Sequence, residues 1–168
     1  VPSIVAVIDF GYENTIVSIL NNNVTEFHRV IAMGSSKIDE AILNNVIADR
    51  QQLDKAERYK KMYGIKRNAD MSNELEWKCS EVIVPIVNEI VREIRICLNF
   101  YTERFSRESI GAIYMIGGFS QMRGLKEYLE EVLDIPSFPI NKLVIDGIEF
   151  SQELDNDKIY YLANALGA

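Results

Sequence analysis

The stretch whose residue types are best suited to binding or chemistry is D-F-G-Y-E-N-T, residues 9–15. It follows the apolar run 5–8 and precedes a second apolar run that begins at Ile16. This pattern predicts a β-hairpin with the seven residues at its bend. A carboxylate at the end of a strand, followed by glycine, can hold a hydrated Mg²⁺ ion beside a phosphate chain. Thr15 can hydrogen-bond across the bend. An ordinary β-turn without a ligand explains the same residues.

A second candidate is A-E-R-Y-K, residues 56–60. Glu57 and Lys60 are three residues apart, so on a helix they share one face. Glu57 could accept hydrogen bonds from ribose hydroxyls with Lys60 beside it. A surface ion pair worth roughly 0.2–0.5 kcal/mol is the alternative explanation.

The third candidate is I-G-G-F-S-Q-M-R-G, residues 116–124, where two glycines follow an apolar strand and precede a helix. Bare backbone at the carboxyl end of a strand is where α/β sheets place their ligands. Glycine pairs also occur in plain tight turns. Neither G-x-G-x-x-G nor a Walker P-loop occurs in the chain.

Composition narrows the classes of function. The net charge of −7 argues against broad nucleic-acid binding, although a single nucleotide needs only a few backbone N–H groups and a metal ion. His28 is the only histidine, and Cys79 and Cys97 fit no zinc motif, so imidazole-based metal sites and Ser-His-Asp triads are disfavoured. No apolar run is long enough to span a membrane, and two cysteines without a disulfide framework indicate a reducing, cytoplasmic setting.

Periodicity predicts the elements that must position these residues. Alternation and helical spacing indicate an α/β fold, a mixed sheet of about five strands with flanking helices. Ser36 is expected to cap its helix, and Pro85 to kink or restart the long one. The predicted strands cover residues 4–9, 15–20, 24–33, 110–116 and 136–140, and the predicted helices cover 37–48, 53–63, 73–105, 121–133 and 158–166.

Taken in order, the motifs D-x-G-x-x-x-T, A-E-x-x-K and G-G-x-x-x-x-x-G resemble the second half of an actin-like ATPase, the superfamily of FtsA, MreB, Hsp70 and actin. Residues 27–34, residues 88–95 together with 100–101, and residues 117–136 resemble the PilM family of type IV pilus assembly proteins. The resemblance implies a ribonuclease H-like, actin-like domain II with a small helical sub-lobe. It covers only the family's second (C-terminal) domain, with 1–34 and 74–168 as core lobe and about 35–73 as sub-lobe.

The resemblance also implies a site for ATP or ADP with Mg²⁺. Asp9 would face the metal through water, and backbone N–H groups of residues 11–14 would face phosphate, with Thr15 bracing the bend. Glu57 and Lys60 would hold the ribose, and the 117–119 loop would lie against the adenosine. The implied ligands are Asp9, Gly11, Tyr12, Asn14, Thr15, Glu57, Lys60, Gly117, Gly118, Phe119 and Arg123; no catalytic residue is predicted.

The implied role is the nucleotide-binding half of a cytoplasmic scaffold, peripheral at the inner face of the cell membrane through the PilN-like cytoplasmic tail of an inner-membrane pilus assembly protein. Homo-oligomers are compatible with this role, whereas nucleic acid and direct membrane insertion are not expected. Tyr12 and Glu13 stand where the family has small residues, and Asp39 where threonine is common. A degenerate scaffold that binds no nucleotide, a small-molecule kinase fragment and an FtsA-like role are the alternatives. No turnover is expected from this fragment alone, and ATPase activity of the full-length protein is left open.

Overall fold

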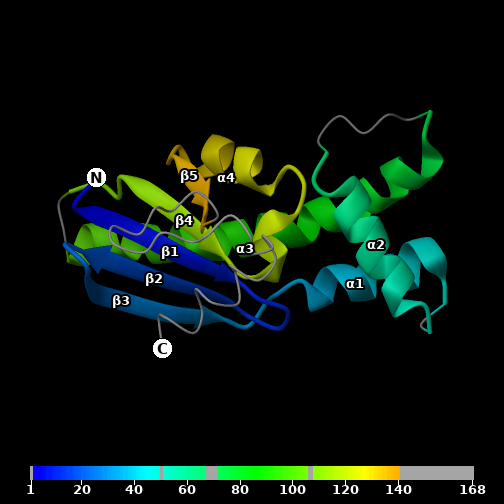
Figure 1. The fold of residues 1–168 in the computed structure, drawn as a ribbon, viewed down its shortest axis with the longest axis horizontal. Coiled ribbons are helices and arrows are strands. Elements are labelled where there is room, and N and C mark those ends of the chain that lie inside the picture. The colour runs from blue at the N-terminus through cyan, green and yellow to red at the C-terminus, as the bar shows by residue number, and fades with distance from the viewer. Residues whose placement is uncertain (1, 50, 67–71, 106–107, 141–168) are drawn as a thin grey trace, which may run out of the picture.

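The computed structural model describes residues 2–49, 51–66, 72–105 and 108–140. Its centre is a five-stranded mixed sheet in the order β3-β2-β1-β4-β5 (Figure 1). β1 pairs antiparallel with β2, and β2 with β3, whereas β1–β4 and β4–β5 are parallel. The predicted α/β fold is therefore confirmed. The strands are β1 (Ile4–Phe10), β2 (Thr15–Asn21), β3 (Val24–Ile31), β4 (Ala112–Ile116) and β5 (Ser137–Pro139).

Alternation along β1 and β2 produces the main core. One face of β1, carrying Ile4, Ile8 and Phe10 among others, is fully buried, and the residues between them are half-buried. This is the period of two that a pleated strand imposes on its side chains. Asn22 and Asn23 take positive φ angles of 48° and 66° and make the tight connection from β2 to β3.

A single long helix, α3 (Glu74–Arg104), covers this face and extends beyond the sheet (Figure 1). Its buried residues recur at three- and four-residue steps, as the sequence predicts. Asn73 caps it by accepting a hydrogen bond from the Glu76 N–H. The helix runs unbroken through Pro85, so the alternative of a restart there is wrong. Within the described ranges, no helix is long and apolar enough to cross a membrane.

A helical sub-lobe packs on the part of α3 that extends past the sheet (Figure 1). It contains α1 (Ser36–Ile42), the π-helical η1 (Leu43–Ile47) and α2 (Leu53–Tyr63). The predicted helix over 37–48 thus changes hydrogen-bonding pattern midway. The expected cap at Ser36 is wrong, because Ser36 is already helical and Ser35 at the N-cap makes no side-chain cap bond.

Two further elements return the chain to the sheet. The 3₁₀ turn η2 (Gly118–Gln121) precedes α4 (Leu125–Leu133), so the helix starts four residues later than predicted. The Ile65 N–H donates to the Arg123 carbonyl at 2.8 Å and ties the end of the sub-lobe to the loop before α4. The acidic segment 141–157 and the predicted helix over 158–166 lie outside the described residues.

Candidate functional site

Asp9 lies where two parallel strands end together. It is the penultimate residue of β1, and the β1–β4 register places it opposite Ile116, the last residue of β4. Its Oδ1 atom is shut away from solvent and has no hydrogen-bond donor in the described part of the chain. Burial raises the pKa of this carboxyl above 3.8. A half-buried acid left without a partner at the carboxyl ends of two strands marks the centre of the candidate site.

The hairpin bend beside Asp9 leaves several backbone N–H groups without a backbone acceptor in the described part of the chain. Its carbonyl groups are occupied, because Ser35 N–H donates to the Gly11 oxygen at 3.1 Å and Ser36 N–H to the Tyr12 oxygen at 2.8 Å. The Gly11 N–H donates within the bend to the Asn14 oxygen at 3.0 Å, so it does not point at a ligand. No backbone hydrogen bond inside the described ranges uses the N–H groups of residues 12–14. These three are the donors that remain for an anion.

Gly34 and Thr15 hold this bend in place from behind. A Cβ on Gly34 would lie 2.3 Å from the Tyr12 oxygen, so only glycine permits the turn after β3 to approach the hairpin this closely. The buried Thr15 hydroxyl donates to the Met33 carbonyl at 2.8 Å, joining β2 to the same turn. Thr15 therefore braces the neighbouring turn and does not reach solvent.

The two adjacent glycines have different environments. Gly117 takes φ +85°, and a Cβ there would lie 2.3 Å from Asp9 Oδ1. Gly118 is exposed, and a Cβ there would meet nothing within 4 Å. Phe119 turns back into the core and makes an edge-to-face contact with Phe10 at a centroid distance of 5.6 Å. Gly118 is consequently the part of this loop that is open to a ligand beside Asp9.

Lys60 does not form the expected surface pair with Glu57. Its ammonium lies 2.8 Å from both carboxylate oxygens of Asp39, in a pair whose side chains are 9% and 1% exposed. One Asp39 oxygen accepts a hydrogen bond at this distance, whereas the other, at the same distance, has no hydrogen-bonding geometry. Burial raises the pKa of Asp39, and Lys60 opposes that rise. Lys60 is thus held inside the sub-lobe by α1.

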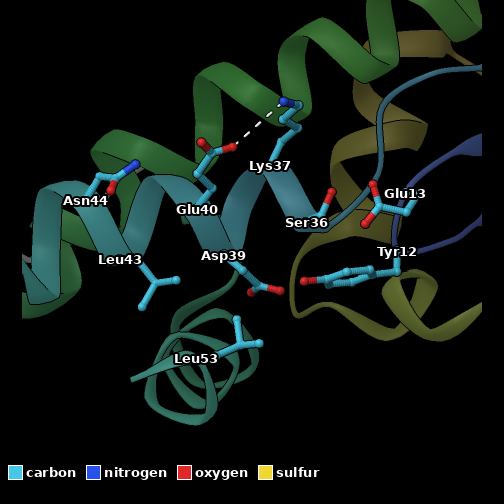
Figure 2. Close-up of a pocket in the computed structure, with 9 residues that line it drawn as sticks. All are labelled: Tyr12, Glu13, Ser36, Lys37, Asp39, Glu40, Leu43, Asn44 and Leu53. Carbon is cyan, nitrogen blue, oxygen red and sulfur yellow. Dashed lines mark ion pairs between the residues drawn. The ribbon is translucent and has the colours of Figure 1, made fainter. Parts of the chain in front are cut away.

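Tyr12 extends from the hairpin toward this ion pair. Figure 2 shows its phenol oxygen directed at the Asp39 carboxylate, beside a hollow of about 390 Å³ between the hairpin, α1 and the start of α2. Burial, followed by the charges of Asp39, Glu13 and Glu57, raises the pKa of Tyr12. The hydroxyl therefore stays protonated beside these carboxylates at neutral pH.

Arg123 lies apart from this hollow. It lines a second hollow of about 510 Å³ with Tyr63, Ile65 and residues of α4. The structure accordingly brings the hairpin, Asp9 and Gly118 to the carboxyl ends of β1 and β4 and places Tyr12 against the sub-lobe. The Asp39–Lys60 pair was missed from sequence; its only local signal is that Asp39 adjoins Ile38 on the apolar face of α1.

The donor set fits one kind of metal site. Within the described ranges, no group of three His, Cys, Asp or Glu side chains could hold a metal ion by itself. Mg²⁺ usually keeps several waters and is bound through one or two carboxylates plus phosphate oxygens. The Asp9 carboxylate, with one oxygen lacking a donor among the described residues, and the nearby hairpin bend with unused backbone N–H groups suit that arrangement. The geometry supports an anionic ligand that carries Mg²⁺ with it.

Comparison with protein families gives one match, to the model described as "Type IV pilus assembly protein PilM", over residues 1–166. No curated protein matches the sequence. Among solved structures, a "PilM-PilN type IV pilus biogenesis complex" shares 25% identity with a TM-score of 0.73, and the match covers 98% of this chain and 44% of the other. The chain thus spans less than half the length of that relative.

More distant structures share the fold. MreB5 of Spiroplasma citri bound to AMPPNP is 17% identical with a TM-score of 0.63, covering 99% of this chain and 55% of that one. The archaeal actin homologue Ta0583 in complex with ADP is 18% identical with a TM-score of 0.60, covering 100% and 51%. At these identities the likeness establishes an actin-like fold.

Proposed function

Since the chain belongs to the family of type IV pilus assembly protein PilM, we propose that it is the nucleotide-binding lobe of an actin-like scaffold used in pilus assembly. The observation that carries the nucleotide part is Asp9, whose inner carboxylate oxygen has no donor in the described part of the chain. Asp9 comes just before the hairpin bend, where the N–H groups of residues 12–14 make no backbone hydrogen bond in the same part of the chain. The actin-like neighbours that were solved with ADP or AMPPNP support a nucleotide as the ligand.

In this proposal the ligand is ADP or ATP with Mg²⁺. The N–H groups of residues 12–14 donate to phosphate oxygens, as exposed backbone donors do in other anion sites. Asp9 would hold the hydrated metal through water, and the metal would supply positive charge next to phosphate. Exposed Gly118 leaves room for the nucleoside. Because Lys60 is bound to Asp39 and Phe119 is buried, ribose and base contacts come from Glu57 and loop backbone.

Calorimetric titration with ADP and ATP, each with and without Mg²⁺, tests this function. Gly118→Arg places a long side chain where a Cβ meets open space, so it blocks the site without disturbing the core. Asn99→Arg, at an exposed position of α3, adds the same charge elsewhere. We expect Mg²⁺-dependent binding that Gly118→Arg and Asp9→Ala abolish and Asn99→Arg preserves. Nucleotide binding whose affinity is the same with and without Mg²⁺ and in both site variants would refute the proposed site.

A second candidate is a scaffold that binds no nucleotide, and the sub-lobe favours it. Asp39 sequesters Lys60, and Tyr12 points into the space between hairpin and sub-lobe. Glu13 adds a negative charge at the hairpin tip, which repels phosphate. Absence of nucleotide binding by the folded chain and by a full-length family member, together with retained binding of that full-length protein to a pilus partner, would select this candidate over the first.

For the cellular role, we propose a cytoplasmic protein held at the inner face of the membrane by a PilN-like tail. The support is the family match and the relative solved as a PilM–PilN complex. Because the chain covers 44% of that relative, the tail is proposed to bind mainly outside this lobe. A synthetic peptide of the PilN-like cytoplasmic tail should bind a full-length family member and bind this chain weakly or not at all. Tight binding to this chain alone would overturn that placement.

A further inference from the structure

Within the described ranges, strand β3 forms one edge of the sheet. It is the last strand in the sheet order, and within the described ranges it pairs only with β2. Six of its eight residues are exposed, and it contains neither proline nor lysine, two of the devices that commonly protect edge strands. The outer N–H and C=O groups of β3, which no strand in the described part of the chain pairs with, can therefore accept another strand.

An aromatic shelf adjoins this edge, formed by Phe27 on β3 together with Phe100 on α3 and Phe105 at the end of α3. Phe100 and Phe105 are 46% and 54% exposed. The ring centroids of Phe27 and Phe100 lie 6.0 Å apart, and those of Phe100 and Phe105 lie 6.1 Å apart. Contiguous exposed apolar side chains of this kind mark interaction surfaces.

Two charges beside the shelf have no counter-ion in the described part of the chain. Arg29 follows Phe27 by two residues, so it projects from the same face of β3. Its charge acts on Cys97 of α3, because burial raises the pKa of Cys97 and Arg29 partly opposes that rise. Glu26 accepts hydrogen bonds from Asn21 and from the Tyr101 hydroxyl, and no cation pairs with it. When two copies of β3 lie antiparallel, Arg29 of each copy comes close to Glu26 of the other, so their charges are complementary.

We propose that β3 pairs with β3 of a second copy of this chain, antiparallel about a two-fold axis at His28. An axis perpendicular to the sheet keeps both α3 helices on one side, so the two aromatic shelves meet across it. Phe27 then opposes Arg29 of the second copy, next to Glu26, and the same contact occurs twice. In an antiparallel pair, directly opposed residues must lie on the same face of the sheet. An axis at His28 meets this condition, because it pairs His28 with itself and Phe27 with Arg29. The register shift near Glu26 then lies outside these central pairs.

Sedimentation equilibrium of the 168-residue chain tests this self-association independently of nucleotide. We expect a concentration-dependent dimer that Arg29→Glu and Phe100→Ser each weaken at least about tenfold, because every substitution acts twice across the axis. Arg92→Glu on α3 and Phe138→Ser on the opposite edge strand are matched controls that leave the dimer intact. A monomer at all concentrations, or a dimer that responds equally to the controls, would overturn the proposal.

A cross-link tests the register. His28→Cys places a thiol opposite its own copy, where directly opposed Cβ atoms lie about 4.5–5.5 Å apart. Mild oxidation should give a disulfide-linked dimer, whereas the parent chain, whose Cys79 and Cys97 are buried, should give none. Circular dichroism confirms that each variant is folded. A His28→Cys dimer whose introduced thiols do not cross-link would refute the axis at His28.

Discussion

Replacing Lys60 by Met tests the buried ion pair that joins α1 to α2. Methionine keeps the length of the side chain and removes its charge, which leaves the 1%-exposed Asp39 carboxylate without a cation. Removing one member of a buried pair costs roughly 3–5 kcal/mol, because the remaining charge stays desolvated. Since the Lys60 side chain is itself only 9% exposed, we expect the free energy of unfolding at pH 7 to fall by about 3 kcal/mol.

The same variant has a predictable pH dependence. Burial already raises the pKa of Asp39 above 3.8, and losing Lys60 raises the folded-state value further. Between 3.8 and that raised value, the folded variant binds a proton that the unfolded chain has released. Stability of the variant therefore falls as pH rises through this window. The deficit relative to the parent is smallest below pH 3.8.

Urea unfolding followed by circular dichroism, at several pH values, measures both effects. Asp39→Asn combined with Lys60→Met should recover much of the loss, because no buried charge remains. Lys78→Met is the matched control, since its ion pair with Glu74 is exposed and is worth less than about 0.5 kcal/mol. If Lys60→Met costs no more than Lys78→Met, or if its cost is the same at every pH, the assignment of a buried pair is refuted.

Four further substitutions probe the site. Gly117→Ala should lower the free energy of unfolding by at least about 2 kcal/mol in urea titrations, because φ is +85° and the Cβ would contact Asp9. Gly118→Ala should leave the free energy of unfolding within about 0.5 kcal/mol of the parent value. Equal effects of the two substitutions would contradict the two environments. Asp9→Asn should be more stable than the parent at pH 7, with the gain vanishing toward pH 3.8, because burial raises the pKa of Asp9; a less stable variant would contradict this. Thr15→Val should cost about 1 kcal/mol in thermal unfolding by removing the hydrogen bond to Met33, and no loss would show that this bond does not brace the turn.

The elements could be predicted because their signals are local. Alternation in residues 4–9 and 15–20 and the helical spacing of 53–63 and 73–105 match β1, β2, α2 and α3 to within one residue at each end. The start of α4 was less predictable, because the 3₁₀ turn after the glycine pair leaves no periodic signal. The change to π-helix after Ile42 likewise has no pattern in the sequence.

The candidate site was predictable where it depends on strand ends. Asp9 and Gly117 come together because β1 and β4 are adjacent and parallel, which their order and the glycine pair indicate. The partner of Lys60 was not predictable, because Asp39 is 21 residues away and the contact depends on how α1 packs against α2. Phe119 is buried because η2 turns it toward Phe10, a direction that a G-G-F sequence does not reveal.

The most direct test of the central claim is a map of amide chemical shifts in a ¹⁵N-labelled chain titrated with ADP and Mg²⁺. The proposed site predicts saturable shifts at Tyr12, Glu13, Asn14 and Gly118, which Asp9→Ala removes. Shifts confined to the hollow around Tyr63 and Arg123, or no shifts at saturating nucleotide, would contradict a nucleotide site at the carboxyl ends of β1 and β4.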